Sequence, residues 1–192
     1  MVVKADRRVV KTKQIIRKAF ADLLVTKPID EITITDIANG ANINRKTFYN
    51  HYSGVYQLLD EIEQEIVTAF AADLAEFDFD QYLTNPTVIF KKIQAIVDQN
   101  YGFYKNLFAR SGDTNLLSKI ATVLSAKAVS FFENKQPNDH AKIRVIADYT
   151  IFGMMAVYQG WFNSDYQLNI DELDQLLNQI LVNGIQRIIA EK

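Results

Sequence analysis

The sequence contains no cysteine, and in 192 residues it has only three prolines and seven glycines. Without cysteine the chain has no disulfide, no thiolate metal site and no thiol nucleophile, which suits a reducing compartment. It has no apolar run of about 18 residues that could cross a membrane. Residues 1–6 also lack the apolar stretch of a signal peptide. We therefore predict a soluble, cytoplasmic protein that does not enter a membrane.

Signatures of catalysis are also missing. The sequence has no Gly-rich phosphate-binding loop and no HExxH or GxSxG motif, and its two histidines, His51 and His140, lie far apart. We interpret the four acids between residues 60 and 65 as one solvated stretch rather than a catalytic pair. A helical enzyme acting in an internal cavity is disfavoured because paired acid and base groups are lacking. The residues predict no enzyme, no metal and no cofactor.

Opposite charges collect in two parts of the chain, although the net charge is only −2. Residues 1–53 hold ten lysines and arginines against five acids, a net charge of +5, whereas the remaining residues carry −7. A basic end on an acidic remainder predicts that the N-terminal part meets a polyanion. A chance imbalance is the alternative explanation.

Apolar residues recur at helical spacing nearly throughout, and strand-like alternation is confined to residues 32–35. The residue before proline avoids the helical region, so Lys27-Pro28 should end the first helix. Later helices are expected over residues 55–77, from 85 through 97, from 113 to about 134, over 140–163 and over 171–190. We predict an all-α fold of about nine helices, with an N-terminal domain at 1–54 and a C-terminal domain at 55–192.

Residues 33–52 have the features of two short helices joined by a tight turn. Thr33 and Asp36 stand three residues apart, as in a capping box, and predict the start of the first helix. Asn42 occupies the turn, where a left-handed backbone is expected and asparagine is well tolerated. Asn44 would then cap the second helix. The inward side chains are predicted to be Ile37, Ala38, Ile43, Phe48 and Tyr52.

The outward side of the second helix suggests a function. Its side chains offer two cations, an amide, hydroxyls and an imidazole: Arg45, Lys46, Thr47, Tyr49, Asn50 and His51. Cations and hydroxyls bind phosphates, while groups that donate and accept hydrogen bonds can read base edges. The backbone N–H groups at Thr33 should also face outward, toward a phosphate. The pattern indicates a helix-turn-helix that binds double-stranded DNA, and a solvated helical hairpin is the alternative.

The runs Ile32–Ala38 and Ala41–Tyr52 resemble the signature of TetR-family regulators. That signature has a Thr cap, Asp-Ile-Ala, a small-residue turn and Thr-Leu/Phe-Tyr-x-His-Phe/Tyr, and the match extends from Ile15 to Leu59. The resemblance implies a TetR-like fold, with a three-helix DNA-binding domain and a helical bundle. It also implies that the following residues contact DNA: Thr33, Thr35, Arg45, Lys46, Thr47, Tyr49, Asn50 and His51. We add Asn44, which begins the second helix, to this predicted set.

This chain departs from the TetR signature at two places. Asn42 stands where the turn glycine is usual, a change that is easily accommodated. The run Ser53-Gly54-Val55 lacks the lysine with which many members reach a phosphate at the start of the connecting helix. Phosphate binding there must be weaker or must come from backbone N–H groups.

The C-terminal part resembles one TetR subgroup through Asn106–Asp113 and Gly160–Phe162. One member type of this subgroup activates a dihydroxyacetone kinase operon by associating with a partner protein. The resemblance therefore leaves two functions open. The first is a repressor that is released from a pseudo-palindromic operator by a small-molecule effector. The second is a co-activator that acts through a protein partner with little direct DNA binding.

TetR-type C-terminal domains dimerise through their last two helices, which the resemblance places here at 140–163 and 171–190. The first of these is apolar almost all round and should be buried on more than one side. The predicted homodimer interface comprises Met154, Met155, Ile180, Leu181, Gly184, Ile185 and Ile188. The core of a monomer is the alternative role for both helices.

Aromatic side chains are plentiful in the C-terminal part, and Tyr or Trp tips inside an apolar cavity would orient a ligand. The predicted pocket residues are Tyr101, Tyr104, Phe108, Phe131, Phe152, Tyr158 and Trp161. A packed core is the more ordinary role for each of them. That a pocket exists follows from the family rather than from the residues, and they do not identify the effector.

Overall fold

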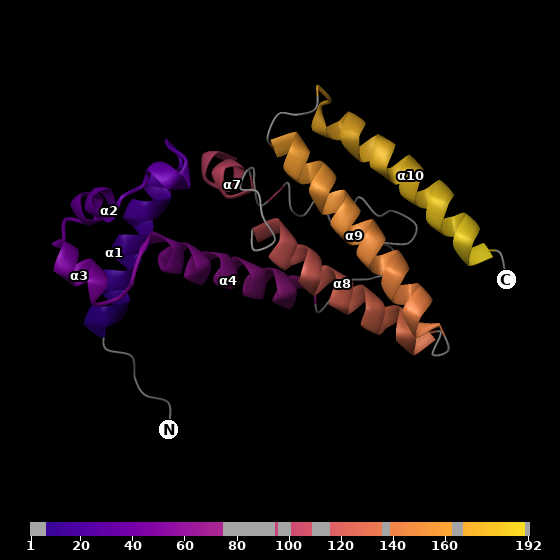
Figure 1. The fold of residues 1–192 in the computed structure, drawn as a ribbon, viewed down its shortest axis with the longest axis horizontal. Helices are drawn as coiled ribbons and strands as arrows, with labels where there is room; N and C mark the ends of the chain where they lie inside the picture. Colours follow the sequence, from indigo (N-terminus) through magenta and orange to yellow (C-terminus); the bar gives the residue numbers. More distant parts are fainter. Residues whose placement is uncertain are drawn as a thin grey trace. The chain divides into compact units, whose positions relative to one another are not determined.

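The structure is a computed structural model that describes residues 7–74, 95, 101–108, 116–135, 139–162 and 167–190, without the side chains of residues 101, 105, 108, 135, 162 and 182–190. Most of the helix predicted over 85–97 lies outside the described residues. Within the described ranges the chain forms eight α-helices and one short 3-10 helix, with no strand (Figure 1). The predicted all-α class is confirmed.

Contacts divide the chain into two compact units. The first unit contains α1 (Arg7–Leu24), η1 (Ile29–Glu31), α2 (Ile34–Gly40), α3 (Arg45–Tyr49), α4 (Val55–Asp73) as far as Ile66, and residues 101–106 of α7 (Tyr101–Phe108). The second unit contains the remainder of α4 and α7 with α8 (Leu116–Lys135), α9 (His140–Phe162) and α10 (Ile170–Ala190). The predicted N-terminal domain ended at residue 54, whereas the first unit extends along α4 to Ile66.

The core of the first unit is built on α1. Ile16, Phe20 and Leu24 recur at helical spacing on one side of this helix and are fully buried. α1 packs closely on α2, where a Cβ added to Gly40 would lie 3.2 Å from the Cβ of Ala19. Side chains from the other helices complete the core: Ile37, Phe48, Tyr52, Leu58 and Leu59. The packing of Leu58 and Leu59 explains why the unit continues into α4.

The turn between α2 and α3 has the left-handed residue that the sequence predicted. Asn42 has a φ of 51°. Its N–H donates to the Asn39 carbonyl at 3.1 Å, and the N–H of Ile43 donates to the Ala38 carbonyl at 3.0 Å. These two bonds form a Schellman motif, which satisfies the last carbonyls of α2 and turns the chain toward α3.

We expect Asn42→Ala to destabilise the protein by about 1 kcal/mol, because an alanine Cβ is strained in the left-handed region. Asn42→Gly should be neutral or slightly stabilising, since glycine adopts this conformation without strain. Urea unfolding followed by circular dichroism measures both changes. Asn39→Ala, an exposed position in α2, is the matched control. Equal unfolding midpoints for the alanine and glycine variants at residue 42 would contradict the expectation.

The first part of α7 packs on the end of α1 within the first unit. A Cβ on Gly102 would lie 3.0 Å from the Val25 Cγ1 and 3.4 Å from the Val25 carbonyl oxygen, so a larger residue there would require Val25 to shift. Asn106 Nδ2 donates to the carbonyl oxygen of Leu24, one of the last carbonyls of α1, which have no partner within the helix. The ring of Phe103 is buried. These contacts explain why residues 101–106 belong to the first unit.

In the second unit, α8 and α9 form an extensive helix pair, and α10 packs on α9. The Tyr158 hydroxyl of α9 donates to the Asp174 carboxylate of α10, and both side chains are buried. Burial and this bond raise the pKa of Tyr158, so its hydroxyl stays protonated. None of the described helices combines the length and apolar character needed to span a bilayer.

Candidate nucleic-acid interface

α2 begins with the capping box that the sequence predicted. The Thr33 hydroxyl oxygen accepts from the Asp36 N–H at 3.1 Å, and Asp36 Oδ2 accepts from the Thr33 N–H at 2.9 Å. The Thr33 hydroxyl also donates to Asp36 Oδ2 at 2.8 Å, and Lys27 Nζ donates to it at 2.9 Å. The Thr33 backbone bond, followed by the Lys27 and Thr33 side-chain bonds, lowers the pKa of Asp36 to about 2.

The capping box uses the hydrogen-bond donors of Thr33 that the sequence analysis expected to be available to DNA. Its N–H was expected to face a phosphate, but the structure directs this N–H to the carboxylate of Asp36. The hydroxyl proton is directed to the same carboxylate. Asp36 therefore takes the place of an external anion at the start of α2. Thr35, the other predicted contact on this helix, is exposed.

The lowered pKa of Asp36 predicts a contribution to stability that depends on pH. A carboxyl whose pKa falls on folding stabilises the native state above its unfolded value of 3.8, and the contribution is lost as the pH falls toward about 2. Asp36→Asn should therefore lose less stability than the wild type between these pH values. Thermal unfolding across that range measures the difference. Asp22→Asn is the charge-matched control, and identical pH profiles for wild type and Asp36→Asn would contradict the assignment.

α3 begins with the predicted asparagine cap. Asn44 Oδ1 accepts from the Thr47 N–H at 2.8 Å and from the Thr47 hydroxyl at 3.0 Å. The Thr47 hydroxyl proton is thus used inside the chain, and its oxygen remains available as an acceptor. The amide nitrogen of Asn44 remains available as a donor.

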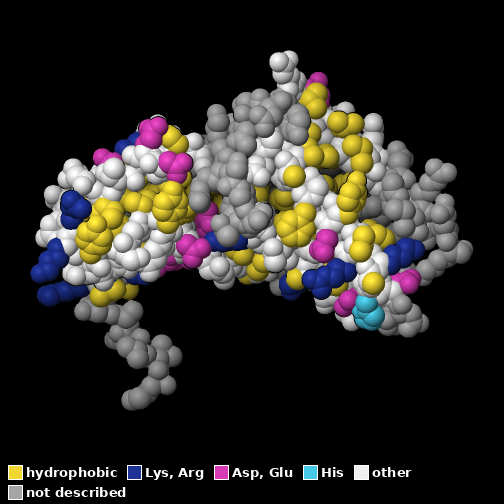
Figure 2. All heavy atoms as spheres, in the orientation of Figure 1, with side chains coloured by type: hydrophobic (Ala, Val, Ile, Leu, Met, Phe, Trp, Pro, Cys, Tyr) yellow, Lys and Arg dark blue, Asp and Glu magenta, His cyan; other side chains and the backbone are white. Residues whose placement is uncertain are grey.

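The side chains of α3 separate into a buried and an outer set, as the sequence predicted. Phe48 is fully buried, and its ring centroid lies 5.7 Å from that of Tyr52, which is also buried. The outer set is exposed at Arg45, Lys46, Tyr49 and Asn50 and half-buried at Thr47 and His51. Figure 2 shows Lys and Arg side chains gathered at the end of the first unit that carries α3. The outer surface of α3 is therefore polar and cationic.

The basic side chains of the first unit differ in whether the chain itself neutralises them. Arg45 and Lys46 form no hydrogen bond or ion pair with any residue that the structure describes, and the same holds for Arg7 and Lys11 at the start of α1. Other cations of the unit have acidic partners. These ion pairs are Lys13–Glu61 (2.6 Å), Arg17–Glu65, Lys18–Asp22 (2.8 Å) and Lys27–Asp36 (2.9 Å). The cations that are available to bind an external anion therefore include Arg45 and Lys46 of α3.

At the start of α4, where the sequence lacks the lysine, one backbone N–H is bonded within the chain. The Ser53 N–H, a candidate for binding phosphate, donates to the side-chain oxygen of Gln57 at 2.5 Å. Tyr56 lies in the first turn of the same helix, and its hydroxyl donates to Asp30 at 2.6 Å. These bonds hold α4 to the first unit.

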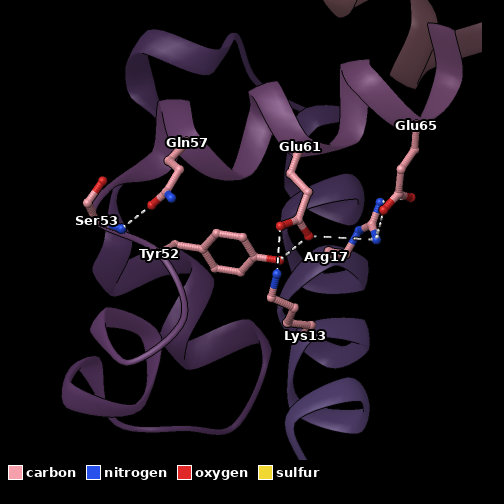
Figure 3. A network of polar contacts seen from close by, with 7 residues as sticks. All are labelled: Lys13, Arg17, Tyr52, Ser53, Gln57, Glu61 and Glu65. Carbon is pink, nitrogen blue, oxygen red and sulfur yellow. Dashed lines mark hydrogen bonds and ion pairs between the residues drawn. The ribbon is translucent and has the colours of Figure 1, made fainter. Parts of the chain in front are cut away.

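Behind α3 lies a polar network that sequence reasoning missed (Figure 3). Glu61 of α4 accepts hydrogen bonds from the Tyr52 hydroxyl at 2.8 Å and from Lys13 Nζ at 2.6 Å. Arg17 of α1 pairs with Glu65 through two of its nitrogens. The sequence carried no signal for these pairs, because their partners lie 9 and 48 residues apart.

The four acids between residues 60 and 65 are not one solvated stretch. Asp60 and Glu65 are exposed, but Glu61 is half-buried in the network and Glu63 is 2% exposed. The sequence interpretation was wrong for these two because consecutive residues of a helix point in different directions. The first and last of these acids are therefore exposed, whereas the two between them face the protein.

The predicted pocket residues do not line one described cavity. A groove of about 480 Å³ lies between α8 and α9, and Phe152 is the one member of the set that lines it. Tyr158 is bonded to Asp174, and the indole nitrogen of Trp161 donates to the Leu168 carbonyl at 2.9 Å. Phe131 is half-buried, Tyr104 belongs to the first unit, and the side chains of residues 101 and 108 lie outside the description.

The predicted interface residues also separate in the structure. Met154, Met155 and Leu181 are buried within the second unit. Ile180 is 59% exposed, whereas the burial of Gly184, Ile185 and Ile188 lies outside the description. Periodicity alone could not say which apolar side of α9 meets its own unit.

The two capped helices, the left-handed turn and the cationic outer surface define a helix-turn-helix module of the DNA-binding class. The family model described as a transcriptional regulator C-terminal region, of the TetR type, matches residues 84–183, more than half of the chain. The chain belongs to this family of TetR-type transcriptional regulators.

Two relatives are similar in sequence. The HTH-type regulator YxbF of Bacillus subtilis is 47% identical over 60 residues, which are 31% of this chain and 16% of YxbF. The HTH-type dhaKLM operon transcriptional activator DhaS of Lactococcus lactis is 32% identical over 100 residues, 50% of this chain and 49% of DhaS. The matches thus cover less than half of either relative. The similar proteins are transcriptional regulators rather than enzymes, as the sequence predicted.

Solved structures share the fold over nearly the whole chain. A structure of the dihydroxyacetone kinase operon activator DhaS covers 94% of this chain and 97% of its own, with a TM-score of 0.58 and 23% identity. The fatty acid degradation regulator FadR from Bacillus halodurans covers 91% and 96%, with a TM-score of 0.62 and 16% identity. These likenesses confirm the predicted TetR-like fold.

Proposed function

We propose that this regulator binds double-stranded DNA through residues 44–52, with α3 lying in the major groove. The observation that carries the proposal is the distribution of cations in the first unit. Arg45 and Lys46 are exposed without a partner among the described residues, whereas Lys13 and Arg17 are paired with acids of α4. Unpaired cations beside an exposed amide, on the second helix of a helix-turn-helix, match what phosphates and base edges require.

The hydrogen bonds within the chain support different roles for the proposed contact residues. Arg45 and Lys46 are donors for phosphate oxygens or for guanine. Asn50 is exposed and can donate and accept at once, the combination that reads adenine. Thr47 gives its proton to Asn44, so it can only accept, for example from a base amino group. Tyr49 and His51, with Thr35 on α2, complete the proposed contact surface.

Genome-wide footprinting of the purified protein at two salt concentrations tests this proposal. The protein should protect discrete pseudo-palindromic sites, and protection should weaken steeply as salt rises, because binding releases the counterions of the contacted phosphates. A protein without salt-dependent affinity for any duplex would overturn it.

We propose that the protein acts as a homodimer through exposed apolar side chains of α9 and α10. Val145 and Tyr149 of α9 are 68% and 83% exposed, and Leu176 and Ile180 of α10 are also exposed. A Cβ on Gly153 would meet nothing within 4 Å, so a partner helix has room to approach α9 there. Figure 2 shows apolar side chains along these helices. A two-fold dimer would present two α3 segments to half-sites one DNA turn apart, about 34–36 Å.

We further propose that a small-molecule effector controls DNA binding by favouring one conformation of the dimer. This part rests on the family resemblance, because only Phe152 of the predicted pocket residues lines a described cavity. A ligand found by thermal-shift screening should change operator affinity. A bound ligand that leaves this affinity unchanged would contradict the coupling.

The direction of regulation has two candidates. Repression is the first of the two functions that the family resemblance left open, whereas the similar DhaS of Lactococcus lactis is named as an activator. A reporter gene fused to a footprinted promoter distinguishes them, since deletion of the regulator raises expression under repression and lowers it under activation. A co-activator that works through a protein partner would change reporter expression without binding the promoter in vitro.

A further inference from the structure

The Tyr52 side chain does more than fill the core of the first unit. Its ring is buried, packs on Phe48 at 5.7 Å and lies 5.1 Å from Lys13 Nζ. A phenylalanine ring would occupy the same space. The hydroxyl adds one further contact, a hydrogen bond donated to Glu61 Oε1 at 2.8 Å. Burial and this bond raise the pKa of Tyr52, so the hydroxyl remains a donor at neutral pH.

Glu61 joins three parts of the first unit (Figure 3). One carboxylate oxygen accepts from Tyr52, and the other accepts from Lys13 of α1 at 2.6 Å. Arg17 Nη1 lies 3.9 Å from Oε1. Burial disfavours the charged form, but the bonds from Lys13 and Tyr52 outweigh it and keep the pKa of Glu61 below its ordinary value. The carboxylate is therefore charged and holds both donors.

The bond from Tyr52 connects the end of α3 directly to α4. The Tyr52 N–H donates to the Phe48 carbonyl at 3.0 Å, so Tyr52 continues the last turn of α3. Glu61 lies on the part of α4 that belongs to the first unit, and the helix passes into the second unit after Ile66. A change in how α4 lies on the first unit would reach α3 through this bond.

We propose that Glu61 is a positioning residue for DNA binding, which fixes the orientation of α3 by accepting the hydrogen bond of Tyr52. The inference rests on the proposed DNA-binding function and names a contact between α4 and residues 44–52 on which that function depends. The Arg17–Glu65 pair, one turn further along α4, makes its hydrogen bonds between α4 and α1. A solely structural role would lower stability without changing the affinity of the folded protein.

Tyr52→Phe and Glu61→Gln, singly and together, test the proposal. The probe is a labelled duplex selected from random DNA by the wild-type protein, at a temperature where circular dichroism shows every variant to be folded. Tyr52→Phe should weaken binding about five- to tenfold, because one bond to a charged acceptor is lost. Glu61→Gln can still accept from the hydroxyl and should weaken it less. The double variant should be no weaker than Tyr52→Phe, since both changes affect the same bond.

The salt dependence separates positioning from direct contact. Tyr52→Phe should keep the wild-type slope of log affinity against log salt, because no phosphate contact is lost. Asp22→Asn, which also removes one acidic charge from the first unit, should not weaken binding. Wild-type affinity in Tyr52→Phe, or a flattened slope, would overturn the inference while leaving DNA binding intact. Absence of salt-dependent binding by the wild type would instead overturn the proposed function itself.

Discussion

Replacing both Arg45 and Lys46 by alanine should reduce DNA affinity by about tenfold or more and flatten its salt dependence. Each phosphate contact contributes about 0.9 to the slope of log affinity against log salt, so two lost contacts lower it by about 1.8 per chain. The effect should be large because both side chains are exposed and have no acidic partner among the described residues. Fluorescence anisotropy at several salt concentrations measures both quantities.

The control for this prediction removes two positive charges elsewhere. Lys18 is exposed and paired with Asp22 on α1, and Lys127 is exposed on α8. The double variant Lys18→Ala with Lys127→Ala has the same net charge as the α3 variant. It should keep most of the affinity and the full slope. Equal slopes for both double variants would show that Arg45 and Lys46 do not contact phosphate.

Tyr149→Asp should convert the protein to monomers and reduce affinity for a two-half-site operator by roughly a hundredfold or more. The ring of Tyr149 is 83% exposed on α9, between Val145 and Phe152, so its burial needs a second copy. An aspartate there would lose its hydration on dimerisation without gaining a partner. A monomer also loses the high effective concentration that links two half-sites.

Sedimentation velocity and binding to a single half-site check this second prediction. The monomer should bind a half-site as well as the wild type does, because α3 is unchanged. Ala69→Asp, which introduces the same charge at an exposed position of α4, should remain dimeric. A Tyr149→Asp protein that still sediments as a dimer would show that the dimer interface does not include this part of α9.

Much of the candidate nucleic-acid interface was predictable because its signals are local. The capping box joins Thr33 to Asp36, and the second cap joins Asn44 to Thr47, both three residues apart. The left-handed turn depends on one asparagine at residue 42. Hydrogen bonds over such short spacings are properties of the backbone and nearby side chains, so the sequence predicts them without knowledge of the fold. The burial of Phe48 and Tyr52 followed from helical periodicity.

The interactions that the sequence did not predict join residues far apart along the chain. Lys13 and Arg17 resemble other cations of α1, and only the packing of α1 against α4 shows that Glu61 and Glu65 neutralise them. Asn106 closes the end of α1 from 82 residues away. Periodicity gave the apolar character of α9, but it could not separate buried Met154 from exposed Tyr149.

By itself, the sequence determined the all-helical class, the helix-turn-helix and its outer side chains, because these depend on propensities, caps and spacing within a few residues. Tertiary structure alone decided which cations remain available to DNA, how far the first unit extends along α4, and which apolar side of α9 is left open. Those properties depend on which distant surfaces meet when the chain folds, and residue spacing carries no record of that.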